Sequence, residues 1–180
     1  MATRGKDISA QRSIASSVTS EKLRVLVVHG PNLNLLGERE PEIYGRTRLS
    51  DIDAELARLG REIGVSVTCF QSNSEGDIVT RLQDARGKFD ALLINPAAYT
   101  HTSVAIRDAV LALNIPSIEV HLSNVYRREP VRHHSMIADI VEARLMGFGA
   151  ESYYLGLRAV PTIVAAHARK SGLAARPTPS

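Results

Sequence analysis

Four short apolar runs, each followed by a polar stretch, set the pattern of this chain. They are LRVLVV (23–28), VSVTCF (65–70), ALLIN (91–95) and SIEVHL (117–122). Three of them are apolar almost throughout instead of alternating, which is typical of strands covered on both faces. The pattern therefore predicts a parallel sheet of four or five strands.

Apolar residues at intervals of three and four lie between and after these runs and predict five helices. The first covers about 49–63, with Ser50 and Asp53 as a capping box. The fourth follows His134 and continues through Leu145, and the fifth ends before Pro161, because a residue that precedes proline disfavours helical backbone. The second and third are centred on 78–85 and 104–113.

Strands that alternate with helices predict an α/β protein with right-handed crossovers and helices on both faces of the sheet. With so few strands, the expected fold is a flavodoxin-like, doubly wound parallel sheet in three layers, α/β/α. We expect one catalytic domain over 23–160, a disordered extension over 1–22 and a loose basic tail over 161–180.

Composition places the chain among globular proteins of the cytoplasm. Hydrophobic residues make up 44% of the 180 residues and charged residues 23%. No apolar run approaches the roughly 18 residues of a membrane span, and 1–22 lack the apolar centre of a secretory signal. Their Ser and Arg content resembles an organelle-targeting peptide, although Asp7 and Glu21 disfavour one. Cys69 is the only cysteine, so no intrachain disulfide forms, which fits a reducing compartment.

The positive charge lies at the two ends of the chain. The sequence pI is 9.2 and the net charge +3. Residues 1–22 carry +2 and 161–180 carry +3, which leaves −2 for 23–160. A mildly acidic body argues against a broad nucleic-acid surface.

Chemically capable side chains follow the predicted strands. Ligands of open α/β sheets bind outside the carboxyl ends of the strands, so these residues should meet. They are His29, Asn32, Arg39 and Tyr44 after the first strand, Gln71, Asn73 and Glu75 after the second, Asn95 and 99–103 after the third, and His121, Ser123, Asn124, Arg128 and Arg132 after the fourth.

Several kinds of site are disfavoured. A nucleotide site needs a glycine-rich turn that opens a helix after the first strand, but Gly30 is followed by Pro31, which has no backbone N–H, and by a long loop. A catalytic zinc needs histidines at ligand spacing, and the adjacent His133 and His134 would diverge on a helix. No serine has the strand-to-helix setting of a hydrolase nucleophile.

Acid–base chemistry on a small polar or anionic ligand remains. Tyr44 would act as a base if a cation such as Arg39 lowered its pKa from about 10. Glu119 and His121 share one face of a strand, where a carboxylate orients and charges an imidazole. The alternative for His121 is a hydrogen-bonded core histidine, and the alternative for the whole chain is a flavodoxin-like binding module without catalysis.

Four motifs, taken together, resemble the type II 3-dehydroquinate dehydratase family over about residues 23–160. They are HGPNLNLLGEREPEIYG, FQSNSEGDIV, INPAAYTHTSVAIRDA and IEVHLSNVYRREPVRHHS. The resemblance implies reversible loss of water from 3-dehydroquinate, in the shikimate pathway or in quinate catabolism, without metal or cofactor.

The resemblance also implies a role for each matching residue. Tyr44 is the base in a lid, Arg39 lowers the pKa of Tyr44 and steadies the developing charge, and Asn32 holds a water at the enolate. His121 is the acid and Glu119 orients it. Substrate binding is expected from Asn95, His101, Leu122, Ser123 and Arg132, and from Asp108 of a neighbouring subunit in a dodecamer built as a tetramer of trimers.

Overall fold

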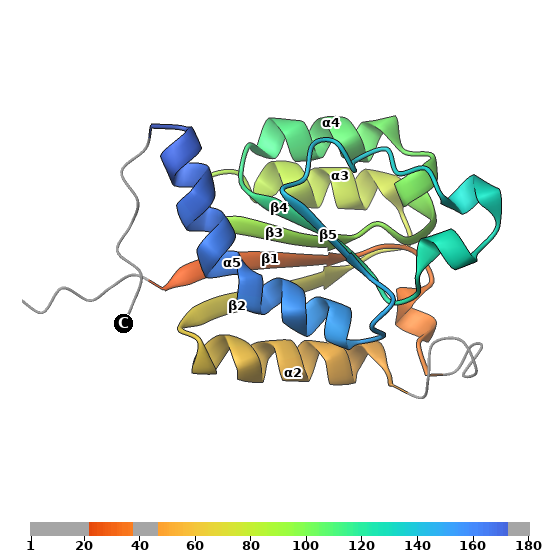
Figure 1. Ribbon diagram of the computed structural model, residues 1–180, viewed down its shortest axis with the longest axis horizontal. Coiled ribbons are helices and arrows are strands. Elements are labelled where there is room, and N and C mark those ends of the chain that lie inside the picture. Colours follow the sequence, from red (N-terminus) through yellow and green to blue (C-terminus); the bar gives the residue numbers. More distant parts are fainter. Residues whose placement is uncertain (1–21, 38–46, 173–180) are drawn as a thin grey trace, which may run out of the picture.

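Five parallel strands form one sheet in the computed structural model, which describes residues 22–37 and 47–172. The strands are β1 (Leu23–His29), β2 (Val65–Gln71), β3 (Ala91–Asn95), β4 (Ser117–His121) and β5 (Ala143–Met146). Their order is β2-β1-β3-β4-β5, which is the flavodoxin-like order, and every neighbouring pair is parallel. The predicted fold class is therefore confirmed (Figure 1).

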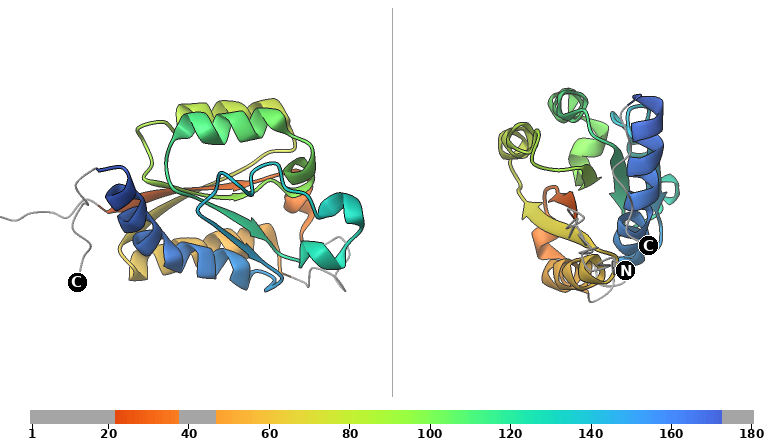
Figure 2. Two further views of the ribbon diagram at one scale, coloured as in Figure 1. Left: turned by 45° about the horizontal axis from the view of Figure 1, so that its top comes forward. Right: turned by 90° about the vertical axis from the view of Figure 1, so that its left-hand side faces the viewer.

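Helices cover both faces of this sheet. Two of them, α3 (Glu75–Asp84) and α4 (Val104–Leu113), lie on one face, and α2 (Leu49–Glu62) and α5 (Glu151–Lys170) lie on the other. The two pairs stand on opposite sides of the strands in the end-on view of Figure 2. In the part of the chain that the structure describes, four short 3₁₀ turns follow the strands: η1 (Leu33–Leu35), η2 (Ala97–His101), η3 (Val125–Arg127) and η4 (Pro130–Arg132).

Alternate residues of the strands supply two separate cores. Val25 and Val27 of β1 pack with α2 and α5, whereas Leu26 and Val28 pack with α3 and α4. All four are fully buried, and each buried side chain of this size contributes about 1.5–3 kcal/mol to stability. Burial on both faces explains why the strands are continuous apolar runs. Among the described residues, no helix has the length and apolar character to cross a membrane.

The prediction of a helix after His134 is wrong. Residues 136–142 form turns, with N–H groups of Ile140 and Val141 donating to the Ile137 carbonyl at 3.1 and 3.2 Å, and the chain then enters β5. The apolar spacing at 137, 140 and 141 lasts for only one turn. The following Leu145 packs on the α2 and α5 core as a strand residue. Pairing with β4 therefore outweighs the local periodicity.

The end of the fifth helix is also corrected. We predicted a stop before Pro161 and a loose tail over 161–180, but α5 continues to Lys170 with Pro161 inside it. Proline removes one helical hydrogen bond. Ile163 and Val164 pack on the core, and His167 and Lys170 reach Glu142 at 3.0 and 2.9 Å. These contacts offset the loss, and they lie too far apart in sequence for a local pattern to show them.

The start of α2 differs from the predicted capping box. Leu49 is its first residue, and the backbone N–H of Arg48 donates to the Asp51 carboxylate at 2.9 Å. Ser50 thus lies inside the helix, and Asp53 accepts from His29 instead. The third helix covers the residues predicted for it, 104–113, and Ser103 caps α4 by accepting from the Ile106 N–H at 2.8 Å.

Candidate active site

A cleft of about 400 Å³ lies at the carboxyl ends of the strands. The turns η1, η2, η3 and η4 gather at this end of the molecule, on the right of Figure 1. Loops after β1, β3 and β4 line the cleft. Seven of the predicted site residues are among the lining residues: Asn32, Asn95, His101, His121, Leu122, Ser123 and Arg132.

The backbone after β1 is held close to the end of β3. Gly30 donates its N–H to the Asn95 carbonyl at 2.8 Å, and a Cβ at Gly30 would stand 2.4 Å from the carbonyl oxygen of Pro96. Only glycine fits this approach. Asn32 follows in the left-handed region, with φ 66°, and donates its N–H to the Asn73 side chain at 2.9 Å. Asn73, at the end of β2, therefore fixes the loop that carries Asn32.

Glu119 and His121 lie on one face of β4, as strand alternation predicted. The His121 Nε2 atom is 2.6 Å from Glu119 Oε1, and His121 is 6% exposed. Burial would raise the pKa of Glu119, but the hydrogen bond and charge of His121, the charge of Arg144 and the hydroxyl of Ser135 together lower it. An ionised carboxylate only accepts, so Nε2 of His121 carries a proton and Nδ1 is left for a ligand.

Two partners of Glu119 escaped the sequence reasoning. Arg144 of β5 stands opposite Glu119 in the parallel register, with its Nε atom 2.8 Å from Glu119 Oε2. The Ser135 hydroxyl donates to the same carboxylate at 2.9 Å. If residues 143–146 had been predicted as a strand, Arg144 would have been recognised as a charged residue on one face of the sheet. The helix predicted there concealed it.

Replacing Arg144 with methionine should lower the free energy of unfolding by about 3 kcal/mol, because Glu119 would keep a buried charge without its cation. The folded pKa of Glu119 is lowered, so the stabilisation is complete above the unfolded value of about 4.3 and is lost as the pH falls through the folded value. Urea unfolding at pH 7 and at acidic pH measures both effects.

The matched control is Arg58→Met, which breaks exposed ion pairs with Glu55 and Glu62 on α2. It should leave the free energy of unfolding nearly unchanged, because exposed ion pairs are screened by water and salt. Equal losses for the two variants would mean that Arg144 is an ordinary surface cation.

His101 ends η2 and faces the cleft as a neutral ring. Its Nδ1 atom lies 2.6 Å from the His134 carbonyl oxygen, which only accepts, so Nδ1 carries the proton. Burial lowers the pKa of His101, the bond to His134 opposes this, and the charges of His121 and Arg132 lower it further. Its Nε2 atom is therefore an acceptor for a ligand hydroxyl.

Two arginines, Arg128 and Arg132, line one wall of the cleft. Arg132 donates from Nε to Glu129 Oε2 at 3.0 Å, and Arg128 Nε lies 3.7 Å from the same oxygen. Both arginines and Glu129 line the cleft. A guanidinium that already holds one carboxylate has the shape and charge to hold another, so this wall suits an anionic ligand.

Two of the predicted site residues that the structure describes do not line the cleft. Glu119 is fully buried behind His121, and Asp108 is exposed on the outer side of α4. Arg39 and Tyr44 lie outside the described residues, so their placement stays a prediction.

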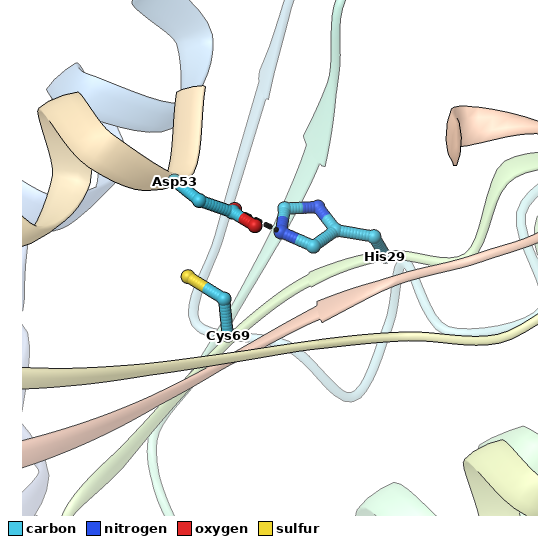
Figure 3. A group of neighbouring side chains, drawn as sticks. All are labelled: His29, Asp53 and Cys69. Carbon is cyan, nitrogen blue, oxygen red and sulfur yellow. Dashed lines mark hydrogen bonds and ion pairs between the residues drawn. The ribbon is translucent and has the colours of Figure 1, made fainter. Parts of the chain in front are cut away.

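One described group has the atoms of a metal site: His29, Asp53 and Cys69, whose ligand atoms lie within 4.8 Å of one another. Figure 3 shows the His29 ring directed at Asp53 of α2, with the Cys69 sulfur beside it. Burial and the charge of Asp53 raise the pKa of the Cys69 thiol. A protonated thiol is a poor ligand, and His29 Nε2 is bonded to Asp53 at 2.9 Å. In the structure His29 and Asp53 are thus joined by a hydrogen bond, and the Cys69 thiol lies beside them.

Comparisons with known proteins agree on one family. Residues 23–161 match the family model Dehydroquinase class II. The 3-dehydroquinate dehydratase of Geotalea daltonii is 57% identical over 138 residues, which cover 77% of this chain and 96% of that protein. That of Acaryochloris marina is 57% identical over 136 residues, 76% of this chain and 91% of that protein.

Solved structures show the same likeness. The type II dehydroquinase from Propionibacterium acnes superposes with a TM-score of 0.76 and is 40% identical over 80% of this chain and 99% of that chain. The type II dehydroquinase from Butyrivibrio crossotus gives 0.75, with 38% identity over 77% of this chain and 97% of that chain.

Proposed function

This chain belongs to the class II dehydroquinase family, and we propose that it is the hydro-lyase that converts 3-dehydroquinate to 3-dehydroshikimate in the shikimate pathway or in quinate degradation. The observation that carries the proposal is the pairing of His121 with the buried, ionised Glu119 at the edge of a cleft lined by arginines.

The reaction needs a base, a stabiliser for negative charge and an acid. The base takes the C2 proton next to the ketone and leaves an enolate, and the C1 hydroxyl then departs from the opposite face as water with a proton from the acid. We assign the first step to Tyr44 as phenolate, with Arg39 lowering its pKa. Asn32, which lines the cleft, would hold a water against the enolate oxygen.

His121 supplies the proton for the leaving hydroxyl. Its Nε2 proton is held by Glu119, so the proton that moves is on Nδ1 of the imidazolium. Ionised Glu119 stabilises that imidazolium, and Arg144 and Ser135 keep the carboxylate fixed. This buried series of contacts orients the acid without exposing the carboxylate to water.

Substrate recognition follows the charges of the cleft. The substrate carboxylate is assigned to Arg132 and to the turn after β4, where Leu122 and Ser123 lie. Its hydroxyls are assigned to Asn95 and to the unprotonated Nε2 of His101. An anionic, hydroxylated ring of this kind suits a cleft in which arginine, amide and imidazole groups converge.

Purified protein should convert 3-dehydroquinate to an enone that absorbs in the near ultraviolet, with no metal added and with a chelator present. All the groups assigned above belong to the chain, so chelation should leave the rate unchanged. A binding module of the same fold would bind the ligand without forming the enone. Absence of turnover in a correctly assembled sample would reject the enzyme assignment.

We further propose a cytoplasmic dodecamer, built as a tetramer of trimers, in which Asp108 reaches the cleft of a neighbouring subunit. Val104, Asp108 and Leu111 are spaced by four and three residues on α4 and so share one helix face. Val104 is 54% and Leu111 50% exposed, which leaves an apolar surface around the carboxylate. Light scattering on the assayed sample measures the assembly size.

A further inference from the structure

Two side chains at the end of β2 reach across to the loop after β1, which carries Asn32. His29 and Gln71 are register partners at the ends of these neighbouring strands, and the Ser72 N–H donates to the His29 carbonyl at 3.1 Å. Beyond this backbone bond, the contacts between the two segments come from the side chains of Gln71 and Asn73. The roles proposed above leave both residues without an assignment.

A backbone donor fixes the orientation of the Asn73 amide. The Asn32 N–H only donates, so the Asn73 atom that lies 2.9 Å from it is the oxygen Oδ1. Asn32 has φ 66°, in the left-handed region that is uncommon for residues other than glycine. Such a conformation persists where the surrounding structure supports it. The Asn73 oxygen supplies that support at the backbone of Asn32.

A backbone acceptor fixes the orientation of the Gln71 amide in the same way. The Gly30 carbonyl only accepts, so the Gln71 atom that lies 3.3 Å from it is the nitrogen Nε2. The same nitrogen lies 3.0 Å from Asn73 Oδ1 and 3.5 Å from Asn34 Oδ1. The position of Gln71 therefore requires a donor, and the position of Asn73 requires an acceptor. The bond between the two amides agrees with both assignments.

We propose that Gln71 and Asn73 are positioning residues that place Asn32 for the enolate and do not bind the substrate themselves. Among the described residues that line the cleft, Asn32 is present and neither Gln71 nor Asn73 is. Their effect on the reaction must then pass through the loop after β1, which they hold at Gly30 and Asn32. This role rests on the proposed dehydratase function, because it requires that Asn32 act on the enolate.

The change from amide to carboxylate tests the proposal, because it should have opposite results at the two positions. Asn73→Asp keeps an oxygen that accepts from Asn32 and Gln71, so kcat should stay within about twofold of the wild type. Gln71→Glu turns an oxygen toward the Gly30 carbonyl and the Asn73 oxygen, so kcat should fall about tenfold. KM should change less than kcat, since Asn32 is assigned to the developing enolate.

The matched control is Gln83→Glu, which makes the same change at an exposed side chain near the end of α3 and should leave kcat and KM at wild-type values. Asn73→Ala removes the acceptor and should lower kcat about fivefold. If Asn73 acts through Asn32, the loss in kcat/KM for Asn73→Ala with Asn32→Ala should equal that of Asn32→Ala alone.

Hydrogen exchange tests the same contacts without turnover. The backbone amides of residues 30–36, followed by mass spectrometry, should exchange faster in Gln71→Glu and Asn73→Ala than in the wild type, and at the wild-type rate in Asn73→Asp. Equal behaviour of Asn73→Asp and Gln71→Glu, or losses that multiply in the double variant, would overturn the proposal. A wild-type protein without turnover would instead reject the dehydratase assignment, while the exchange rates still test the hold on the loop. Thermal unfolding of each variant shows whether the fold is retained.

Discussion

Replacing His121 with asparagine is expected to lower kcat by about 10²- to 10⁴-fold, the range for loss of a general acid. Asparagine retains a side chain that Glu119 can hydrogen-bond, but it carries no proton that it can give to a leaving hydroxyl. The pair is close, at 2.6 Å, and buried, so no solvent group stands ready to replace the imidazole. Steady-state rates of enone formation measure the effect.

Binding should survive this change. His121 is one of several groups that line the cleft, and Arg132 and His101 remain in place to hold the substrate. Glu119→Gln is the matched companion, since it keeps a hydrogen-bond acceptor for Nε2 and removes the charge that stabilises the imidazolium. Its rate should fall between those of the wild type and His121→Asn. A His121→Asn rate within threefold of wild type would assign the proton to another group.

Tyr44→Phe is expected to lower kcat by about 10²- to 10⁴-fold, because the phenolate that we propose as the base for the C2 proton is lost while the ring remains. A competitive inhibitor that resembles the substrate should bind with nearly unchanged affinity. Turnover at a near-normal rate would exclude Tyr44 as the base.

The pH dependence separates the roles of Arg39 and Tyr44. If Arg39 lowers the pKa of Tyr44, Arg39→Met should raise that pKa toward its ordinary value of about 10. The acidic limb of the kcat/KM profile should then shift to higher pH. Tyr99→Phe is the control, because its hydroxyl bonds the Asn73 carbonyl and lies outside the assigned chemistry. If the pH profile of kcat/KM does not shift, Arg39 does not lower the pKa of Tyr44 and contributes only to substrate binding.

His29 shows how far a sequence pattern reaches into the site. It stood among the cleft candidates because it ends the first apolar run. It has the same strand parity as Val25 and Val27, so it points into the core shared by α2 and α5. That parity was visible in the sequence, but its partners Asp53 and Tyr153 lie 24 and 124 residues away. Only the packed helices bring those partners to the ring.

The sequence by itself determined the sheet and the edge at which the cleft forms. Apolar runs buried on both faces require a parallel sheet with helices on each side, and parallel strands bring their following loops together. Asn95, His101 and His121 therefore meet because of the order of elements. The acid–base pairing of His121 with Glu119 could be predicted because the two residues lie two positions apart on one strand.

The tertiary structure decided what depends on contacts between distant residues. Strand β5 forms in place of a helix because it pairs with β4 and brings Arg144 to Glu119. Helix α5 passes Pro161 because its second half packs on the core and reaches Glu142. Local periodicity has no information about such partners, since their stabilisation exists only once the chain is folded.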